Sequence, residues 1–127
     1  MKRARAAFIV AAIAAALAVP ASALAYTDTG RVEFDTGLIC KGCVVTIHNV
    51  TTGANGSTTS DSQGYWSASG FVSGYRYQVW ATYYLSPGCT YAHRNYFEWI
   101  QPSSNKTFDP LYVYSTAIQS GCPILWG

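Results

Sequence analysis

After residue 25, hydrophobic and polar positions alternate in short runs, and no stretch repeats with the 3.6-residue period of an amphipathic helix. The runs are rich in β-branched and aromatic residues, and clusters of Gly, Asn, Ser, Asp and Pro separate them, as in strands joined by tight turns. The predicted strands span residues 30–34, 43–50, 57–60, 65–69, 75–84, 91–100 and 107–115. This pattern predicts an all-β, seven-stranded antiparallel sandwich forming a single domain.

The alternation also assigns the two faces of each predicted strand, because successive side chains of a strand point to opposite sides of the sheet. The side with fewer polar groups is expected to face the core. The residues expected to point inward are Cys43, Val45, Ile47, Tyr75, Tyr77, Val79, Ala81, Tyr83, Phe97 and Trp99. The outward-facing residues of interest are His48, Trp80, Tyr84, Arg94, Tyr96 and Glu98.

The first 25 residues have a different pattern. Lys2, Arg3 and Arg5 precede an uninterrupted apolar run over residues 6–19, and Pro20 and small residues follow. This order is typical of a cleaved secretion signal, and the apolar run is shorter than the roughly 20 residues that span a bilayer. We therefore predict a signal peptide over 1–25, a sandwich over 26–115 and a tail over 116–127, in a secreted, extracellular protein. A retained N-terminal anchor is the alternative.

Removing the predicted signal changes the charge of the chain. The full sequence has eight basic and six acidic side chains, and three of the basic ones lie in the signal. The remainder carries five basic and six acidic side chains, which is a net charge of −1. A nearly neutral domain lacks the basic surface expected of a nucleic-acid-binding protein, and we expect neither a nucleic-acid partner nor membrane insertion after cleavage.

The four cysteines all follow the predicted signal, at Cys40, Cys43, Cys89 and Cys122. An even number in a small exported domain indicates two disulfides. In an antiparallel order the strand beginning at 43 starts at the end of the sandwich where the strand ending at 84 finishes. All four thiols are then expected at that end. We favour Cys40–Cys43 with Cys89–Cys122, which would pin the tail, while the other two pairings and a zinc site stay open.

Several short motifs, taken together, resemble the transthyretin-like (prealbumin-like) sandwich of carboxypeptidase regulatory-like domains and collagen-adhesin B-type repeats. They are Gly30-Arg31-Val32, Gly42-Cys43-Val44-Val45-Thr46-Ile47, the Thr52-Gly53 turn, Thr59-Ser60-Asp61-Ser62-Gln63-Gly64-Tyr65 and Gly74-Tyr75-Arg76-Tyr77-Gln78-Val79. The resemblance covers residues 30–84, with Cys43 in place of the usual Ala and Ser60 in place of the usual Thr. It implies an Ig-like sandwich in a family of mostly structural or binding domains, by analogy of fold.

Candidate catalytic residues are few. The two histidines, His48 and His93, lie in no recognisable triad or metal-ligand spacing. Hydroxyisourate hydrolases use the transthyretin-like fold and end in Tyr-Arg-Gly-Ser, whereas this chain ends in Pro-Ile-Leu-Trp-Gly. We therefore expect a non-enzymatic protein without cofactor or metal, with a small secreted hydrolase as an alternative.

The sequence has more aromatic residues than a core of this size needs: four Trp, ten Tyr and five Phe, only one of them within the predicted signal. On the outer side, Trp80, Tyr84 and Tyr96 are expected near Arg94, Glu98 and His48. Flat rings beside hydrogen-bonding groups suit sugar rings, but they also suit sheet packing or a protein partner. We expect a structural or protein-interaction role at or outside the cell surface, with binding of a glycan or cell-wall polymer as the alternative.

Overall fold

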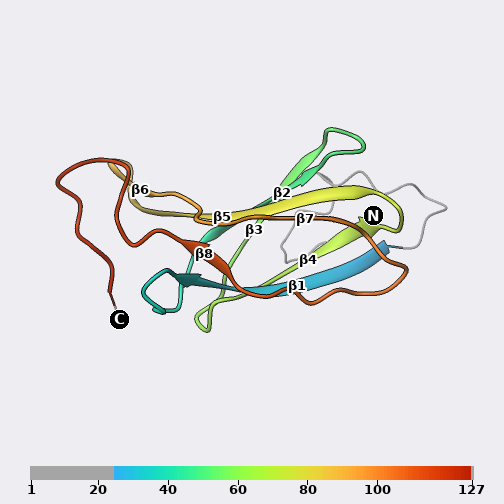
Figure 1. Ribbon diagram of the computed structural model, residues 1–127, viewed down its shortest axis with the longest axis horizontal. Helices are drawn as coiled ribbons and strands as arrows, with labels where there is room; N and C mark the ends of the chain where they lie inside the picture. The colour runs from blue at the N-terminus through green and yellow to red at the C-terminus, as the bar shows by residue number, and fades with distance from the viewer. Residues whose placement is uncertain (1–24, 127) are drawn as a thin grey trace.

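A computed structural model of the chain describes residues 25–126. All regular secondary structure in this range consists of β-strands (Figure 1). The strands are β1 (Ala25–Phe34), β2 (Val44–Asn49), β3 (Asn55–Thr59), β4 (Tyr65–Val72), β5 (Arg76–Ser86), β6 (Cys89–Tyr91), β7 (Phe97–Ile100) and β8 (Leu111–Val113). The predicted signal peptide lies outside the described residues, except that Ala25 begins β1.

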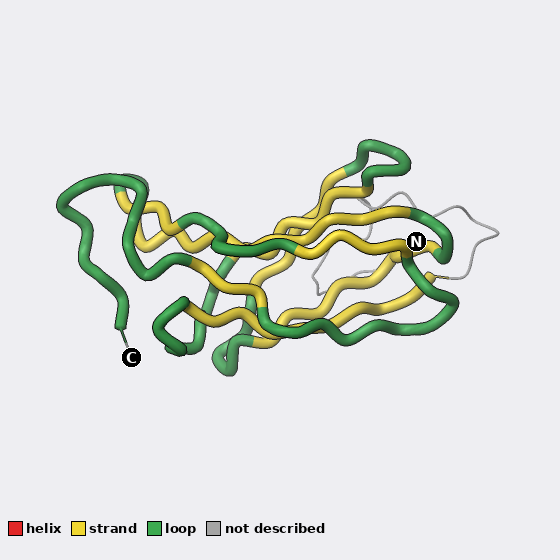
Figure 2. Tube along the Cα trace, viewed as in Figure 1, coloured by secondary structure: helices red, strands yellow, loops and turns green. Residues whose placement is uncertain are grey.

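The strands form two sheets that pack face to face as a sandwich (Figures 1 and 2). The smaller sheet has the order β4-β1-β8, and the larger has the order β3-β2-β5-β6, with β7 also paired to β5. This confirms the predicted all-β sandwich. The sandwich is not wholly antiparallel, however, because β8 pairs with β1 in the parallel direction. The segment that precedes β8 runs beside β1, and the Thr29 N–H of β1 donates to the Lys106 carbonyl of that segment at 2.9 Å.

The predicted strand over 91–100 is wrong as a single element. It divides into β6 and β7, and the residues between them leave β5 and bond to β8 of the other sheet. The Arg94 N–H donates to the Tyr112 carbonyl at 2.7 Å, and the Tyr114 N–H donates to the Ala92 carbonyl at 2.9 Å. This crossover joins the two sheets along one side of the sandwich. It also brings the number of strands to eight, and the predicted strand over 107–115 shortens to β8.

The predicted division into inner and outer faces is confirmed along β2, β5 and β7. Val45, Ile47 and Val79 are fully buried, whereas the residues that alternate with them are more exposed. An aromatic cluster fills one part of the core, where the Tyr77 ring lies 4.9 Å from that of Phe71, centroid to centroid. Edge contacts between such rings add about 0.5–1.5 kcal/mol beyond the burial of area.

Both predicted disulfides are present at one end of the sandwich. Cys40–Cys43 closes a two-residue turn with Cα atoms 5.8 Å apart, and both residues are fully buried. Cys89–Cys122 links the start of β6 to the tail. The register of Val44 opposite Thr82 places the start of β2 beside the far part of β5. The shared end therefore follows from the strand order, as predicted.

Candidate functional site

The outer face of the larger sheet brings together three of the predicted binding residues. His48 on β2 lies opposite Gln78 on β5, and Gln78 lies opposite Glu98 on β7. The Nδ1 atom of His48 is 2.7 Å from Oδ1 of Asn55, and the Gln78 amide donates to Glu98 Oε1 at 2.8 Å. A row of polar side chains therefore crosses four neighbouring strands.

Trp80 lies beside this polar row, one outward position further along β5. It is opposite Thr46 on β2, and its ring is 6.1 Å from the ring of His93. His93 comes from the crossover between the sheets, so its place here depends on the division of the predicted strand. The sequence did not single out His93 for this face. The face thus combines a half-buried indole, a second ring and a row of hydrogen-bonding groups.

Glu98 remains ionised on this face. Its hydrogen bond from Gln78 and its contact with Arg76, whose Nη1 is 3.1 Å from Oε2, lower the pKa of the Glu98 carboxyl. An exposed carboxylate with a lowered pKa accepts hydrogen bonds but makes a poor general acid at neutral pH. The chemistry available to this group is therefore recognition of donors.

The other three predicted residues lie outside this row. Tyr96 lies just before β7 and is 56% exposed. Tyr84 lies near the far end of β5, where the strand turns into β6. Arg94 belongs to the crossover, where its main chain bonds to β8. The six predicted residues therefore do not form one compact cluster, because the strand that was expected to carry Arg94 beside Glu98 is divided.

A second feature, which the alternation did not predict, lies at the end of the sandwich with the disulfides. Six exposed large apolar side chains belong to the β5–β6 hairpin and to the chain after β8. They are Tyr84, Leu85, Tyr114, Ile118, Ile124 and Trp126. We call this set the hairpin–tail surface. Ile118 and Trp126 are its most exposed members, at 69% and 70%. The tail has no strand, so alternation gave no signal there; its apolar residues around Cys122 were the only indication.

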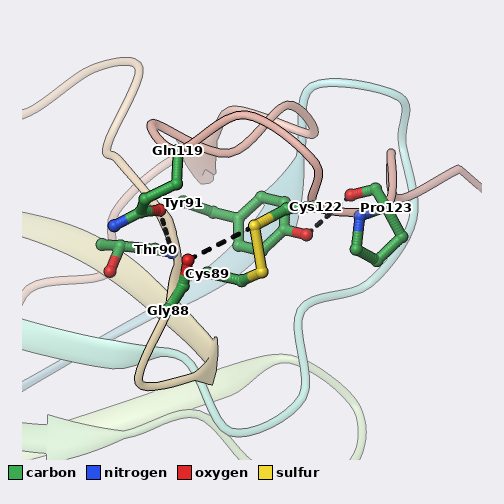
Figure 3. Close-up of a disulfide and its surroundings, with 7 residues drawn as sticks. All are labelled: Gly88, Cys89, Thr90, Tyr91, Gln119, Cys122 and Pro123. Carbon is green, nitrogen blue, oxygen red and sulfur yellow. Dashed lines mark hydrogen bonds between the residues drawn. A yellow bond between two sulfur atoms is a disulfide. The ribbon is translucent and has the colours of Figure 1, made fainter.

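The tail is held against the hairpin by several contacts (Figure 3). Besides the disulfide, the Tyr91 hydroxyl donates to the Pro123 carbonyl at 2.6 Å, and the Thr90 N–H donates to Gln119 Oε1 at 2.7 Å. The Ile118 N–H also donates to the Thr90 carbonyl at 2.8 Å. Although the whole segment after β8 is loop (Figure 2), it therefore has a defined position.

A groove of about 430 Å³ lies on the side of the sandwich where β3 and β4 end their sheets. Its lining consists of Thr29, Thr58, Thr59, Asp61, Tyr65, Trp66 and Ser67. Asp61 shapes the turn between the two strands, since its Oδ1 accepts from the N–H groups of Gln63 and Tyr65, both at 2.9 Å. This carboxylate is exposed and supplies the charge of the lining.

A buried carboxyl lies in the core. Asp28 on β1 is fully buried, and its Oδ1 accepts from Gln101 Nε2 at 3.0 Å and from the Lys106 N–H at 2.9 Å. Gln101 accepts in turn from Trp99 Nε1 at 2.9 Å. Burial raises the pKa of Asp28 to about 6, and the bonds from Gln101 and Lys106 lower it in part. These bonds give Asp28 a structural role in fixing the connection between β7 and β8.

Within residues 25–126, no three His, Cys, Asp or Glu side chains are grouped so that they could hold a metal ion. The same residues contain no helix with the length and hydrophobicity needed to cross a membrane.

Comparison with known proteins gives a weak structural likeness. The chain matches no protein-family model. It also matches no curated protein. Among solved structures it is similar to the shaft pilin SpaA from Lactobacillus rhamnosus GG, determined as a double mutant, with 15% sequence identity and a TM-score of 0.49 over 76% of this chain. The chain spans about half of that pilin chain, 49% of its length. The transthyretin-like family therefore stays a prediction, and the chain's function has to be inferred from its own surfaces.

Proposed function

We propose that this chain is a secreted, non-catalytic β-sandwich that acts at or outside the cell surface by binding another protein through the hairpin–tail surface. One observation carries the proposal: six large apolar side chains stay exposed on a hairpin and a tail that a disulfide joins. Large apolar side chains left exposed at one end of a soluble domain are unfavourable in water, and we take them as the mark of an interaction site.

The anchoring of the tail supports this proposal. A loosely attached apolar segment would lose conformational freedom on binding, which costs affinity, whereas a fixed segment avoids much of that cost. The disulfide and the bond from Tyr91 to Pro123 fix the tail before any partner arrives. Trp126 adds an aromatic side chain of the kind that dominates the energy of protein interfaces.

The two carboxyls with shifted pKa values support a non-catalytic role. The carboxyl with a raised pKa, Asp28, is enclosed in the core and hydrogen-bonded there. Glu98, which is accessible, has a lowered pKa and remains ionised. Asp28 is therefore closed off from substrates, and Glu98 has no proton to donate at neutral pH, so neither carboxyl can serve as an accessible general acid.

The proposal is tested by capture of extracellular proteins on the immobilised mature chain. The wild type is compared with the double variant Ile118→Ser, Trp126→Ser and with Ile100→Ser, a control that removes an exposed apolar side chain from β7. We expect the same captured protein with the wild type and the control, and at least tenfold less with the double variant. Equal capture by all three proteins would refute the proposal.

The outer face of the larger sheet favours a second candidate function, the binding of a glycan or cell-wall polymer. Trp80 lies beside the row of His48, Gln78 and Glu98, and such a pair of features suits a sugar ring, which stacks on an indole while its hydroxyls bond to polar neighbours. A glycan array with wild type and Trp80→Ala tests it. Array signals that persist unchanged in the variant would exclude this face as the sugar site.

A further inference from the structure

The two sides of the sandwich are closed differently. On one side the crossover after β6 bonds to β8 and joins the sheets. On the other side β3 and β4 are the last strands of their sheets and do not pair with each other. Each therefore presents a row of main-chain N–H and C=O groups without a strand partner among the described residues.

The hydrogen bonds of β3 show which of its groups are available. The Ser60 N–H donates to the Cys43 carbonyl at 2.9 Å, and the Asn49 N–H donates to the Ala54 carbonyl at 2.8 Å. In an antiparallel pair these bonds alternate along the strand, so the even-numbered residues of β3 bond to β2. The main-chain groups of Asn55, Ser57 and Thr59 therefore point away from the sheet.

This edge has no lysine, proline or bulge to protect it from pairing. Exposed edges are commonly blocked by Lys, Pro or a bulge, whereas β3 has the sequence Asn-Gly-Ser-Thr-Thr and pairs regularly with β2. The edge of β4 is less available. The N–H and C=O of Tyr65 are both bonded to Asp61, at 2.9 and 2.8 Å. The edge of β3 is therefore the better place for an added strand.

The groove lies directly beside this edge. In a strand added along β3, the residues opposite Gly56 and Thr58 would point their side chains to the same side as Thr58, which lines the groove. Gly56 leaves additional room, since it has no side chain. An added strand would thus have both hydrogen-bonding partners and space for alternate side chains, which are the two requirements of peptide recognition by strand addition.

We infer that the edge of β3 binds an extended peptide segment of another protein, antiparallel to β3, with apolar side chains at two alternate positions and a basic residue before them. The apolar side chains would lie against Tyr65 and Trp66, the aromatic residues of the groove lining. The basic residue follows from direction: the N-terminal end of such a peptide lies beyond Thr59, next to the exposed carboxylate of Asp61. This surface is separate from the hairpin–tail surface, and the inference does not depend on the function proposed for the latter.

A second copy of the chain fits this edge less well than such a peptide. Pairing of β3 with itself would place Gly56 and Thr58 of the other copy above the groove, and these small side chains would leave most of it unfilled. The strand also carries no basic residue for Asp61. The filling of the groove and the charge complementarity therefore both favour the apolar, basic peptide.

The inference is tested by selecting a random decapeptide display library on the immobilised mature chain. We expect enriched peptides with a Lys or Arg followed by two apolar residues at alternate positions. Ser57→Pro removes an N–H that makes no bond to β2, so it should preserve the fold and weaken binding of a selected peptide at least tenfold. Ser57→Ala keeps that N–H and is the matched control. Thermal unfolding of both variants checks that the sandwich is retained.

Two further arms identify the mode of binding. Asp61→Asn keeps the turn-forming oxygen and removes the charge, so it should abolish the preference for a basic residue. Methylating the peptide N–H groups that face Ser57 and its outward neighbours should abolish binding, while methylating the intervening ones should not. The double variant Ile118→Ser, Trp126→Ser should bind the peptide as the wild type does, which separates this test from that of the proposed function.

Three results would overturn the inference. The first is that no peptide is enriched, and the second is that enriched peptides bind the Ser57→Pro variant as tightly as the Ser57→Ala control. The third is that the wild type sediments as a dimer and the Ser57→Pro variant as a monomer. The last result would assign the edge to a second copy of the chain.

Discussion

The buried carboxyl of Asp28 predicts that this protein becomes less stable as the pH rises from 4 to 7. The pKa of Asp28 is raised from 3.8 to about 6, mainly because burial disfavours the charged form. The folded protein therefore holds a proton that the unfolded chain has already released. The stabilisation from this proton is fully present below about pH 3.8 and is lost as the pH rises through about 6.

The size of the effect follows from the shift. One pKa unit corresponds to 1.36 kcal/mol, so a pKa of about 6 in place of 3.8 gives at most about 3 kcal/mol between the two ends of this range. The value of about 6 already contains the effects of the polar and charged groups that face Asp28. Lys106 lowers it through its main-chain bond and its charge, and the amide of Gln101 lowers it through a hydrogen bond.

The variant Asp28→Asn removes the titration while leaving an oxygen for the bonds from Gln101 and Lys106. Its amide nitrogen takes the place of Oδ2, which has no partner in the core, so the variant carries a pH-independent cost of about 1–3 kcal/mol. The informative quantity is therefore how the difference in unfolding free energy between wild type and variant changes with pH.

Urea unfolding followed by tryptophan fluorescence at pH 4 to 7.5 measures this difference, with Asp109→Asn as a control for loss of an exposed carboxylate. We expect the wild type to lose about 2–3 kcal/mol relative to Asp28→Asn across this range. A difference that stays constant within about 0.5 kcal/mol, or that changes in the opposite direction, would show that Asp28 is not a buried acid with a raised pKa.

Three further predictions concern stability. Replacing both Cys89 and Cys122 by Ala opens a loop with a sequence separation of 33 residues and should lower the free energy of unfolding in urea by about 3–4 kcal/mol. New protease cleavage should be confined to the tail, and cleavage equal to that of the wild type would contradict the prediction. Tyr77→Phe should lower the unfolding free energy by about 1–3 kcal/mol in the same assay, because it leaves a buried main-chain N–H without its acceptor, and a change below 0.5 kcal/mol would argue against that bond. Gly30→Ala should lower the melting temperature by several degrees, because the new Cβ would lie 2.6 Å from Nε1 of Trp66, and an unchanged melting temperature would mean that the indole moves at no cost.

The sequence by itself determined the class of the fold, the inner and outer faces of the main strands and the favoured disulfide pairs. Alternation along a strand is a local property, since the direction of each side chain depends only on its position. This is why Val45, Val79 and Trp99 could be assigned to the core. The shared end of the four cysteines followed from counting antiparallel strands.

Only the tertiary structure decided which neighbour each backbone segment bonds to. The sequence predicts one strand over residues 91–100, yet the main chain changes from β5 to β8 and back between β6 and β7. A hydrogen bond between strands depends on segments distant in sequence, and the polarity of one segment does not identify its partner. Consequently Arg94 was expected beside Glu98 but lies elsewhere, and His93 contacts Trp80 without having been expected to.

The buried Asp28 and the exposed tail were decided in the same way. Asp28 lies between two threonines in a polar stretch, and its burial depends on Gln101 and Lys106, more than 70 residues later in the chain. Ala117, Cys122 and Leu125 of the tail pack against the core, whereas Ile118, Ile124 and Trp126 remain exposed on a segment that the disulfide holds in place. Side-chain direction is set within a few residues, but burial and bonding partners are set by the packing of the whole chain.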